Sequence, residues 1–328
     1  MPNPAYNDTA VQLTHVSKTF TQVQHDGGLS SLFRPEKKVV HALNDVSLRI
    51  QKGEFAAYAG PNGAGKSTTF KLLCGLLSPS SGAVQTLGLD PMRDRIALMG
   101  RTGVFFGGRT ELWWDHPVIS SFKWKKKVWD VPDDVYERQF ALACEYLDLK
   151  PLLHTFAREL SLGQKLRCDL GLLLLHDPEL LLLDEPTLGL DVLAKRQMID
   201  FLKALNREKS TTILVTSHDL DDLTEMASRL LLISNGAIAF DGDLPRLRQM
   251  LGDERLLTLT RPGPAPDLYG AAHVSSEGDR HTYVFQGPTD LPQLMQQAYA
   301  LPDLLDVELG RPPIEQQIAQ LYAHWQNR

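Results

Sequence analysis

The chain has 328 residues, of which 43% are hydrophobic, and this length and composition fit one large domain with a smaller one. Its formal net charge of −6 argues against a protein that binds nucleic acid mainly through phosphate contacts. Cys74, Cys144 and Cys168 lack metal-ligand spacing, so we expect reduced, buried thiols in a cytosolic protein. No apolar run is long enough to span a bilayer and no signal peptide is visible, so we expect a chain that is soluble or peripheral on a membrane partner.

The N-terminal region predicts two strands separated by a polar segment. Residues 11–16 alternate like a half-buried edge strand, and residues 39–50 form a second strand region. Between them, residues 21–38 show no periodicity, and we expect a surface excursion there. Residues 54–59 then form a short apolar run that suits a buried strand.

A phosphate-binding motif follows that strand. Residues 60–67 read Gly-Pro-Asn-Gly-Ala-Gly-Lys-Ser and match G-x-x-x-x-G-K-S. The glycines permit backbone dihedrals that let successive N–H groups turn onto phosphate oxygens. Lys66 adds a positive charge near the β- and γ-phosphates, and Ser67 offers a hydroxyl to Mg²⁺. The helix expected from residue 68 onward would add its N-terminal dipole. The alternative is a chance glycine-rich turn, which the Lys-Ser pair and the flanking strand and helix disfavour.

After a short buried strand at residues 103–106 the sequence changes character. Residues 109–171 have helical spacing and no strong strand, which predicts a mostly helical insertion. Within it, the lysines at 123 and 125–127 alternate with Trp124 and Trp129. Such a run can bind nucleic acid or a lipid surface, but we favour a solvated helix face with the apolar residues turned inward.

Two acidic residues end the next buried strand, at residues 180–184. Ligands of open α/β sheets bind at the carboxyl ends of the strands, where Asp184 is suited to holding Mg²⁺ and Glu185 to polarising a water. The two adjacent side chains can share a site because the strand ends there. The alternative is an acidic N-cap for the helix that contains Leu193.

Further polar residues surround this strand in the sequence. Ser161 is a good N-cap for the preceding helix, and Gly163 would let N–H groups approach an anion. His218 follows a strand at residues 211–216, and its imidazole could donate to a γ-phosphate, although a lone histidine is more often structural. Asn235-Gly236 predicts a hairpin. Strands that alternate with helices predict a mostly parallel α/β sheet.

A second pattern begins near residue 245. We therefore predict two domains, residues 1–245, with a helical subdomain at about 109–171, and a small α/β domain over 246–328 without catalytic residues. The elements expected in the second domain are strands at 255–260, 272–275, 281–286 and 305–309 and helices at 291–301 and 314–325.

Together these motifs resemble the ATP-binding subunits of ABC transporters over about residues 11–244. The pentapeptide Leu-Ser-Leu-Gly-Gln at 160–164 is a signature peculiar to that family among P-loop proteins. Within the family, the chain looks like a bacterial subgroup that pairs with ABC-2-type membrane subunits, most of them exporters. The features that carry this likeness are the central leucine of the pentapeptide, the insert before Val40 and the stretch 110–117. The motifs that carry the resemblance, in the family's order and spacing, are 60–67, 160–164, 184–185, 190–191 and His218.

The resemblance implies a P-loop NTPase fold with a mostly parallel sheet, an antiparallel β edge region and a helical insertion. It implies ATP and Mg²⁺ as cofactors, ATP hydrolysis coupled to export through separate integral membrane permease subunits, and a head-to-tail dimer with a second copy of the chain. The protein would be peripheral on the cytoplasmic face of the inner or plasma membrane, without direct nucleic-acid binding. The alternative is a soluble ABC ATPase that acts on a nucleic-acid, ribosomal or assembly partner; a GTPase is disfavoured by the signature and by the absence of an Asn-Lys-x-Asp motif.

The resemblance also implies catalytic roles. Glu185 would be the general base, His218 would sense the γ-phosphate, and Asp184 and Ser67 would support Mg²⁺. The residues expected at the phosphates are Gly60, Pro61, Asn62, Gly63, Ala64, Gly65, Lys66, Ser67 and Thr68.

Other residues would complete the nucleotide site. Ser161, Gly163 and Gln164 would close on the nucleotide of the opposite copy, and Asp191 matches the loop that crosses the dimer seam. Phe20 matches the aromatic residue that stacks on adenine.

One position departs from the family pattern. The family has a glutamine after the strand equivalent to residues 103–106, where it touches Mg²⁺ and couples to the membrane subunit, whereas Gly108 stands here. Either a water or a neighbour such as Glu111 substitutes, or coupling is weakened.

Overall fold

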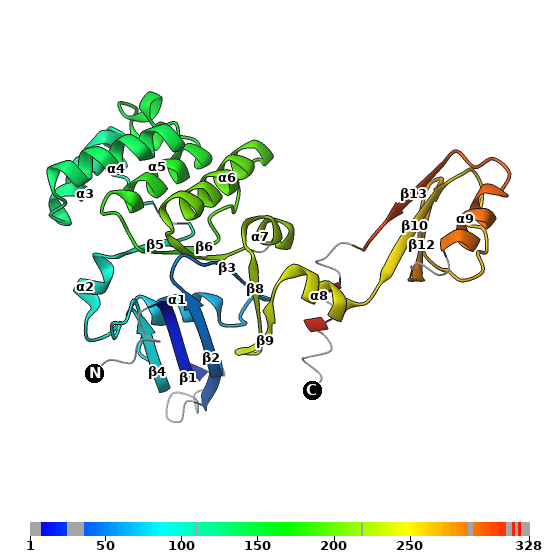
Figure 1. Cartoon of the computed structure of the whole chain (residues 1–328), viewed down its shortest axis with the longest axis horizontal. Coiled ribbons are helices and arrows are strands. Elements are labelled where there is room, and N and C mark those ends of the chain that lie inside the picture. Colours follow the sequence, from blue (N-terminus) through cyan, green and yellow to red (C-terminus); the bar gives the residue numbers. More distant parts are fainter. Residues whose placement is uncertain are drawn as a thin grey trace, which may run out of the picture. The chain divides into compact units, whose positions relative to one another are not determined.

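The computed structural model describes residues 8–24, 36–108, 110–217, 219–287, 291–312, 317–318 and 321–322. The chain divides into two compact units, residues 1–242 and 243–328, and each is described by itself (Figure 1). Within the described part of the chain, none of the helices has both the length and the apolar character of a membrane span.

The first unit is built on a six-stranded sheet with the order β5-β6-β7-β3-β8-β9. All neighbours in this sheet are parallel except β8 and β9, which form the predicted hairpin around Asn235 and Gly236. Every residue of β3, β6 and β7 is buried, which explains their continuous apolar sequences. The mostly parallel sheet is therefore confirmed. The strands are β3 (Phe55–Ala59), β5 (Thr102–Phe106), β6 (Leu180–Asp184), β7 (Thr212–Thr216), β8 (Arg229–Ser234) and β9 (Ala237–Gly242).

The parallel strands bring their carboxyl ends to one edge of this sheet, where ligands of such folds bind. The P-loop follows β3, the acid pair ends β6, and Ser217 follows β7. The loop after β5 reaches the same edge, because the N–H of Gly107 donates to the carbonyl of Asp184 at 3.0 Å. Four separate segments thus meet where the sequence predicts chemistry.

A three-stranded antiparallel sheet, β2-β1-β4, forms the predicted β edge region from β1 (Thr9–Gln24), β2 (Glu36–Gln51) and β4 (Ser81–Thr86). The surface excursion predicted over residues 21–38 is wrong at both ends, since 21–24 and 36–38 continue the ladder between β1 and β2. Residues 25–35 lie outside the described residues. The alternation of polar and apolar residues is lost because Thr21, Lys38 and Val39 are exposed rather than packed on a core.

Helix α1 (Lys66–Leu73) joins the two sheets of the first unit (Figure 1). Its buried Phe70 and Leu73 share one core with Val11 of β1 and Leu182 of β6. The P-loop is therefore fixed on both sides by packed elements. The other helices outside the helical subdomain are α2 (Arg95–Met99), α6 (Val192–Lys209) and α7 (Leu220–Met226).

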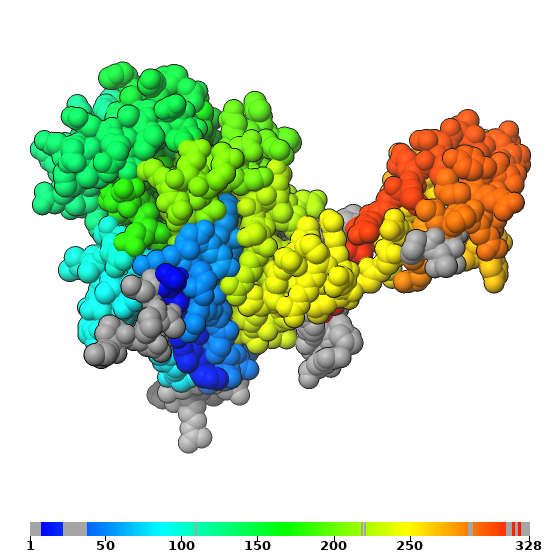
Figure 2. Space-filling view, in the orientation of Figure 1, coloured from blue at the N-terminus to red at the C-terminus, as the bar shows by residue number. Residues whose placement is uncertain are grey.

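The predicted helical insertion is confirmed by α3 (Val118–Val128), α4 (Asp133–Tyr146) and α5 (Leu162–Leu174), whose side chains gather in one lobe of the first unit (Figure 2). Phe122 is fully buried, and α5 approaches it at Gly171, where a Cβ would lie 3.0 Å from the Phe122 ring.

The lysine run on α3 is only partly the solvated face that we expected. Lys125 is buried and ion-paired with Glu111, whereas Trp124 is 42% exposed rather than turned inward. Lys123 and Lys127 are exposed, as predicted.

The second unit is a four-stranded antiparallel sheet, β11-β12-β10-β13, with its own core of Leu257, Leu259, Tyr283, Phe285 and Leu294. The predicted strands and first helix are confirmed, while of the helix predicted over 314–325 only residues 317–318 and 321–322 are described, and they are helical. The elements are α8 (Leu244–Leu251), β10 (Glu254–Thr260), β11 (Ala272–Glu277), β12 (Arg280–Gln286), α9 (Leu291–Tyr299) and β13 (Asp306–Gly310).

Truncating Phe122 should destabilise the first unit. Phe122→Ala leaves a cavity between α3 and α5, and we expect the free energy of unfolding to fall by about 3–5 kcal/mol. Calorimetric melting measures the loss, with Val128→Ala on the exposed side of the same helix as the control. Equal melting temperatures for the two variants would contradict this account of the helical packing.

Candidate functional site

The P-loop has the strand-loop-helix context that the motif requires, between β3 and α1. Gly65 caps α1 with φ 113°, and a Cβ there would lie 2.5 Å from the carbonyl oxygen of Ala42. A Cβ on Gly60 would lie 2.4 Å from the carbonyl oxygen of Ile233. Glycine is therefore required at both positions by the close approach of neighbouring backbone.

The ammonium of Lys66 is held inside the loop. Its Nζ donates to the carbonyl oxygens of Gly60 at 2.6 Å and Pro61 at 3.2 Å, and only 6% of the residue is exposed. Burial lowers the pKa of Lys66, and the nearby carboxylates of Glu185 and Asp184 raise it in part. Two carboxylates beside one ammonium leave an excess of negative charge, which suits a divalent cation.

Asp184 is oriented by two hydroxyl donors from different elements. Ser67 Oγ donates to its Oδ2 at 2.8 Å, and Thr216 Oγ1 donates to its Oδ1 at 2.7 Å. The Ser67 hydroxyl and the Asp184 carboxylate thus lie together at the end of the P-loop. This pair of oxygen donors fits Mg²⁺, which prefers carboxylate and hydroxyl or water oxygens.

Thr216 is a site residue that the sequence analysis missed. It is fully buried at the end of β7, and the register of the sheet places it beside Asp184. Besides its bond to Asp184, its Oγ1 accepts from the N–H of Glu185 at 3.0 Å. The only signal in the sequence is its position at the end of a strand, and that does not say which strand lies next to it.

Glu185 adopts φ 57°, a left-handed conformation that is uncommon for residues with a side chain. Its N–H is held by Thr216, so the strand ends and the chain turns at this residue. The acid pair is not the N-cap of α6, because Asp191 Oδ1 accepts from the N–H of Ala194 at 2.8 Å and caps that helix. The alternative interpretation of Asp184 and Glu185 as a helix cap is therefore wrong.

The last four residues of the signature pentapeptide, 161–164, line a separate cleft of about 430 Å³. Ser161 and Gln164 form a reciprocal capping box at the start of α5, in which Ser161 Oγ accepts from the Gln164 N–H and Gln164 Oε1 accepts from the Ser161 N–H. Gly163 and Asp191 line the same cleft. The structure thus brings four predicted site residues together on α5 and the loop before α6.

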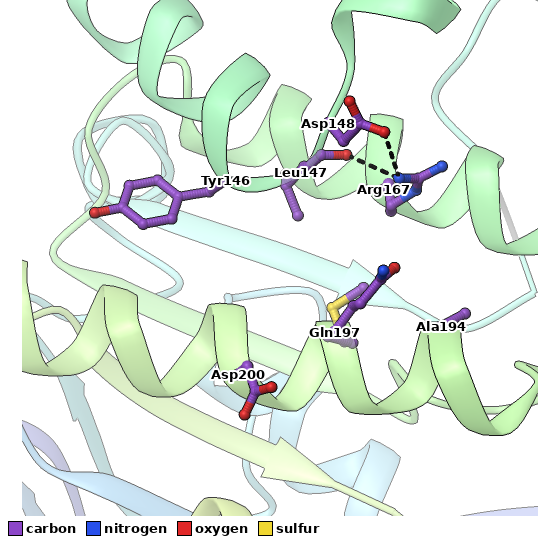
Figure 3. A pocket seen from close by; sticks show the side chains of 8 residues that line it. Tyr146, Leu147, Asp148, Arg167, Ala194, Gln197 and Asp200 are labelled. Carbon is purple, nitrogen blue, oxygen red and sulfur yellow. Dashed lines mark hydrogen bonds and ion pairs between the residues drawn. The ribbon is translucent and has the colours of Figure 1, made fainter.

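A second cavity of about 290 Å³ shares Arg167, Ala194 and Gln197 with that cleft (Figure 3). Arg167 donates to the carbonyl of Leu147 at 3.3 Å and pairs with Asp148 at 3.6 Å, so it joins α5 to the end of α4. The helix that carries the signature therefore also holds a guanidinium one to two turns from Ser161.

Two predicted site residues are not joined to these groups by any described contact. Phe20 lies half-buried on β1 opposite Val40, with the Lys18 ammonium 5.2 Å from its ring centre, and its stacking on adenine stays a prediction. His218 lies outside the described residues. Its neighbours in the chain are Ser217, which is buried, and Asp219, which is half-buried. The proposed role of His218 also stays a prediction.

Gly108 has φ 81°, with open space around the position of a Cβ. A glutamine there would have room, but its backbone would be strained in this conformation. Glu111 is a poor substitute for the missing glutamine, because its carboxylate is paired with Lys125 and its N–H donates to Asp169 Oδ1 at 2.9 Å.

Asp169 is a second residue that the sequence analysis missed. Thr110 Oγ1 also donates to its Oδ1, at 3.0 Å, so this buried carboxylate ties the loop after β5 to the signature helix α5. Burial raises the pKa of Asp169 to about 6, although the hydrogen bonds from Glu111 and Thr110 lower it in part. The signal available in the sequence was a lone acid among leucines.

The raised pKa of Asp169 predicts a pH-dependent stability. A carboxyl whose pKa is higher in the folded than in the unfolded state stabilises the fold when protonated, and this contribution is lost as the pH rises through about 6. Asn can accept both hydrogen bonds on one oxygen and carries no charge. We expect the free energy of unfolding of Asp169→Asn, relative to wild type, to rise by about 1–2 kcal/mol between roughly pH 4.5 and 7.5.

Chemical denaturation across that pH range measures the difference, and the exposed Asp200→Asn serves as the control. A pH-independent difference for Asp169→Asn would contradict the buried, destabilised carboxylate.

Comparisons with known proteins show which family this sequence resembles. A family described as "ABC transporter" matches residues 43–188. The ABC transporter ATP-binding protein NatA of Bacillus subtilis is 30% identical over 227 residues, which are 69% of this chain and 92% of NatA. The probable multidrug ABC transporter ATP-binding protein YbhF of Escherichia coli is 32% identical over 221 residues, but these matched residues span only 37% of YbhF.

Solved structures confirm the predicted fold. CbiO1 of Clostridium perfringens, part of the ABC transporter complex cbiONQ, aligns with a TM-score of 0.61 at 24% identity, over 73% of this chain and 90% of that chain. A dimeric ATP-binding cassette in a post-hydrolysis state with ADP and phosphate aligns with a TM-score of 0.59 at 23% identity, over 71% and 98% of the two chains.

Proposed function

The chain belongs to the family of ABC transporter ATP-binding proteins, and we propose that its ATPase activity drives export through separate ABC-2-type membrane subunits. The observation that carries the proposal is the hydrogen bond from Ser67 to Asp184, which joins the P-loop to the acid pair. The P-loop and the acid pair meet at the carboxyl edge of one sheet, which supports a shared role in binding and hydrolysing ATP.

The residues of the P-loop would bind the triphosphate of ATP. Backbone N–H groups within residues 60–68, apart from Pro61, which has none, and the ammonium of Lys66 would hold its oxygens. Mg²⁺, held by Ser67 and supported by Asp184, would supply neutralisation of the phosphate charge. Phosphoryl transfer to water depends mostly on such positioning and charge compensation.

Glu185 would orient and deprotonate the attacking water. Its backbone N–H is held by Thr216, so the residue stays at the carboxyl edge of the sheet, next to Asp184 in the chain. His218, two residues after Thr216, would donate to the γ-phosphate.

We infer a head-to-tail dimer with a second copy of the chain. The signature cleft formed by Ser161, Gly163, Gln164 and Asp191 would close on the nucleotide bound to the P-loop of the partner. One P-loop and one signature per chain fit this arrangement, as does the dimeric cassette among the structural relatives. Phe20 would stack on adenine.

Integral membrane subunits are the partners that the family membership favours, since CbiO1 is part of a transporter complex. The protein would then be peripheral on the cytoplasmic face of the membrane, with residues 246–328 as an accessory domain. Export rests on the ABC-2-like features of the sequence, such as the tryptophans at 113–114. A soluble ABC ATPase with a nucleic-acid or ribosomal partner is the alternative, and the net charge of −6 disfavours it.

Replacing Glu185 should separate ATP binding from hydrolysis. Glu185→Gln removes the general base but leaves the P-loop intact, so we expect ATP to bind while turnover falls roughly 10²–10⁴-fold. Lys66→Ala, which removes the phosphate-binding ammonium, should instead lose tight ATP binding. Nucleotide titration and single-turnover hydrolysis measure the two effects, and near-normal turnover of Glu185→Gln would remove it from the role of base.

The membrane partner can be identified with the same variant. We expect tagged Glu185→Gln, purified from its own cells in mild detergent with ATP, to bring an integral membrane protein in about one-to-one ratio. Lys66→Ala is the matched control for ATP-dependent association. Recovery with ribosomes or nucleic acid would instead support the alternative function.

A further inference from the structure

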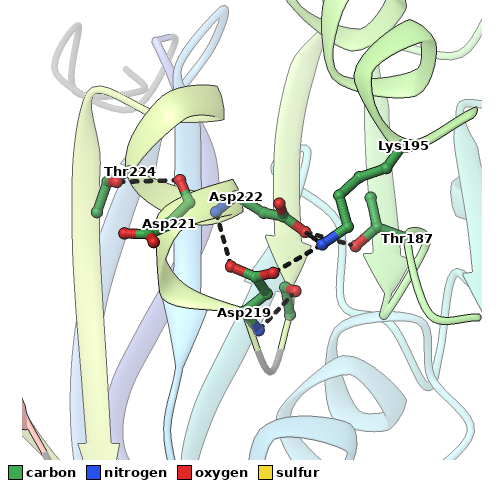
Figure 4. A network of polar contacts seen from close by, with 7 residues as sticks. Thr187, Lys195, Asp219, Asp221, Asp222 and Thr224 are labelled. Atoms are coloured by element: carbon green, nitrogen blue, oxygen red, sulfur yellow. Dashed lines mark hydrogen bonds and ion pairs between the residues drawn. The ribbon is translucent and has the colours of Figure 1, made fainter. Parts of the chain in front are cut away.

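A polar network formed by Thr187, Lys195, Asp219 and Asp222 has no role in the site described above (Figure 4). Lys195 Nζ donates to Asp219 Oδ2 at 2.6 Å and lies 3.0 Å from Asp222 Oδ2. Thr187 Oγ1 donates to the same oxygen of Asp222 at 3.2 Å. Lys195 and Thr187 approach from one side and the two aspartates from the other, so one ammonium bridges α6 to α7.

Each member of this network lies close in sequence to a predicted site residue. Thr187 is two residues after Glu185, and Asp219 directly follows His218. The N–H of Lys195 donates to the carbonyl of Asp191 at 2.9 Å, so Lys195 belongs to the first turn of α6. The network therefore connects the acid pair, the predicted dimer-seam loop and the segment after β7.

Asp219 joins Lys195 to the turn that follows β7. Its Oδ1 accepts from the N–H of Asp222 at 3.1 Å and caps α7, while its own N–H donates to Ser217 Oγ at 3.0 Å. Both carboxylate oxygens of Asp219 are therefore occupied, one by α7 and one by Lys195. Loss of the ammonium would free one of the two anchors of this turn.

The surroundings make the Lys195–Asp222 ion pair stronger than an ordinary surface pair, because Asp222 is 7% exposed and the side chain of Lys195 is 28% exposed. The side chain of Asp219 is more open to solvent, at 41%, and its second carboxylate oxygen is held by α7. A partly buried ion pair is little screened by solvent, and removal of one partner leaves the other charge uncompensated. Lys195 is thus the cation that joins α6 to both aspartates.

We propose that Lys195 is a positioning residue that locks the segment carrying His218 to the loop carrying Asp191. This inference rests on the proposed function, in which His218 meets the γ-phosphate and Asp191 lies at the dimer seam. Closure of the dimer against Asp191 would then act through Lys195 on Asp219 and Ser217, the two neighbours of His218 in the chain. Because Lys195 makes no described contact with the P-loop, its loss affects turnover and leaves ATP affinity unchanged.

Arg196 provides a matched control on the same helix. Its Nη1 pairs with Glu225 Oε1 at 2.6 Å, so it also bridges α6 to α7, but it makes no described contact with Asp219 or Thr187. Arg196→Met removes an ion pair between the same two helices without releasing the His218 segment. A merely structural role of Lys195 would make the two substitutions equivalent.

The test compares kcat, the KM for ATP and the melting temperature of full-length Lys195→Met, Lys195→Arg and Arg196→Met. Misplacement of a reacting group by about 1 Å can lower a rate about 10²-fold, so we expect kcat of Lys195→Met to fall by about 10- to 100-fold with KM within about 3-fold. Lys195→Arg keeps the charge and should recover most of the turnover. Arg196→Met should keep kcat within about 2-fold of wild type, with a melting temperature similar to that of Lys195→Met.

Equal kcat values for Lys195→Met and Arg196→Met would overturn the inference, as would a loss of turnover explained by a large fall in melting temperature. If wild type hydrolyses ATP and Lys195→Met does so equally well, only this inference fails. If wild type does not bind ATP, the proposed function fails with it.

Discussion

The pairing of β6 with β7 is the interaction on which the candidate site depends. Its parallel register sets Asp184 opposite Thr216, and the hydroxyl of Thr216 then holds both the Asp184 carboxylate and the Glu185 N–H. The strands are buried on both faces, so apolar packing fixes this register and the polar groups at its end follow. A small shift between the two strands would separate the acids from the P-loop serine.

The sequence was most informative where function needs local residue order. Residues 60–67 are one continuous stretch of sequence, and the alternation of strands and helices predicts the parallel sheet around it. Thr216, Asp169 and Lys195 could not be predicted in this way, because their partners lie 32, 58 to 59 and 24 residues away in the chain. Such contacts depend on strand order and helix packing, which periodicity does not determine.

Two buried charged residues, Asp169 and Lys125, join the helical subdomain to the loop after β5. Asp169 receives two hydrogen bonds from the loop after β5, and Lys125 neutralises Glu111 of the same loop. Gly108 adds a left-handed turn just before them. The loop after β5 is thus anchored through its later residues to the signature helix. Movement of this helix and of the loop should therefore be correlated.

The left-handed backbone of Glu185 has a consequence for how this sequence can change. A non-glycine residue in this conformation carries a strain on the order of 1 kcal/mol, which glycine would relieve. The most stable residue at this position is therefore one that has no carboxylate. Selection for stability alone would remove the acid, so a library screened only for resistance to heat should drift toward glycine here and lose the general base proposed above.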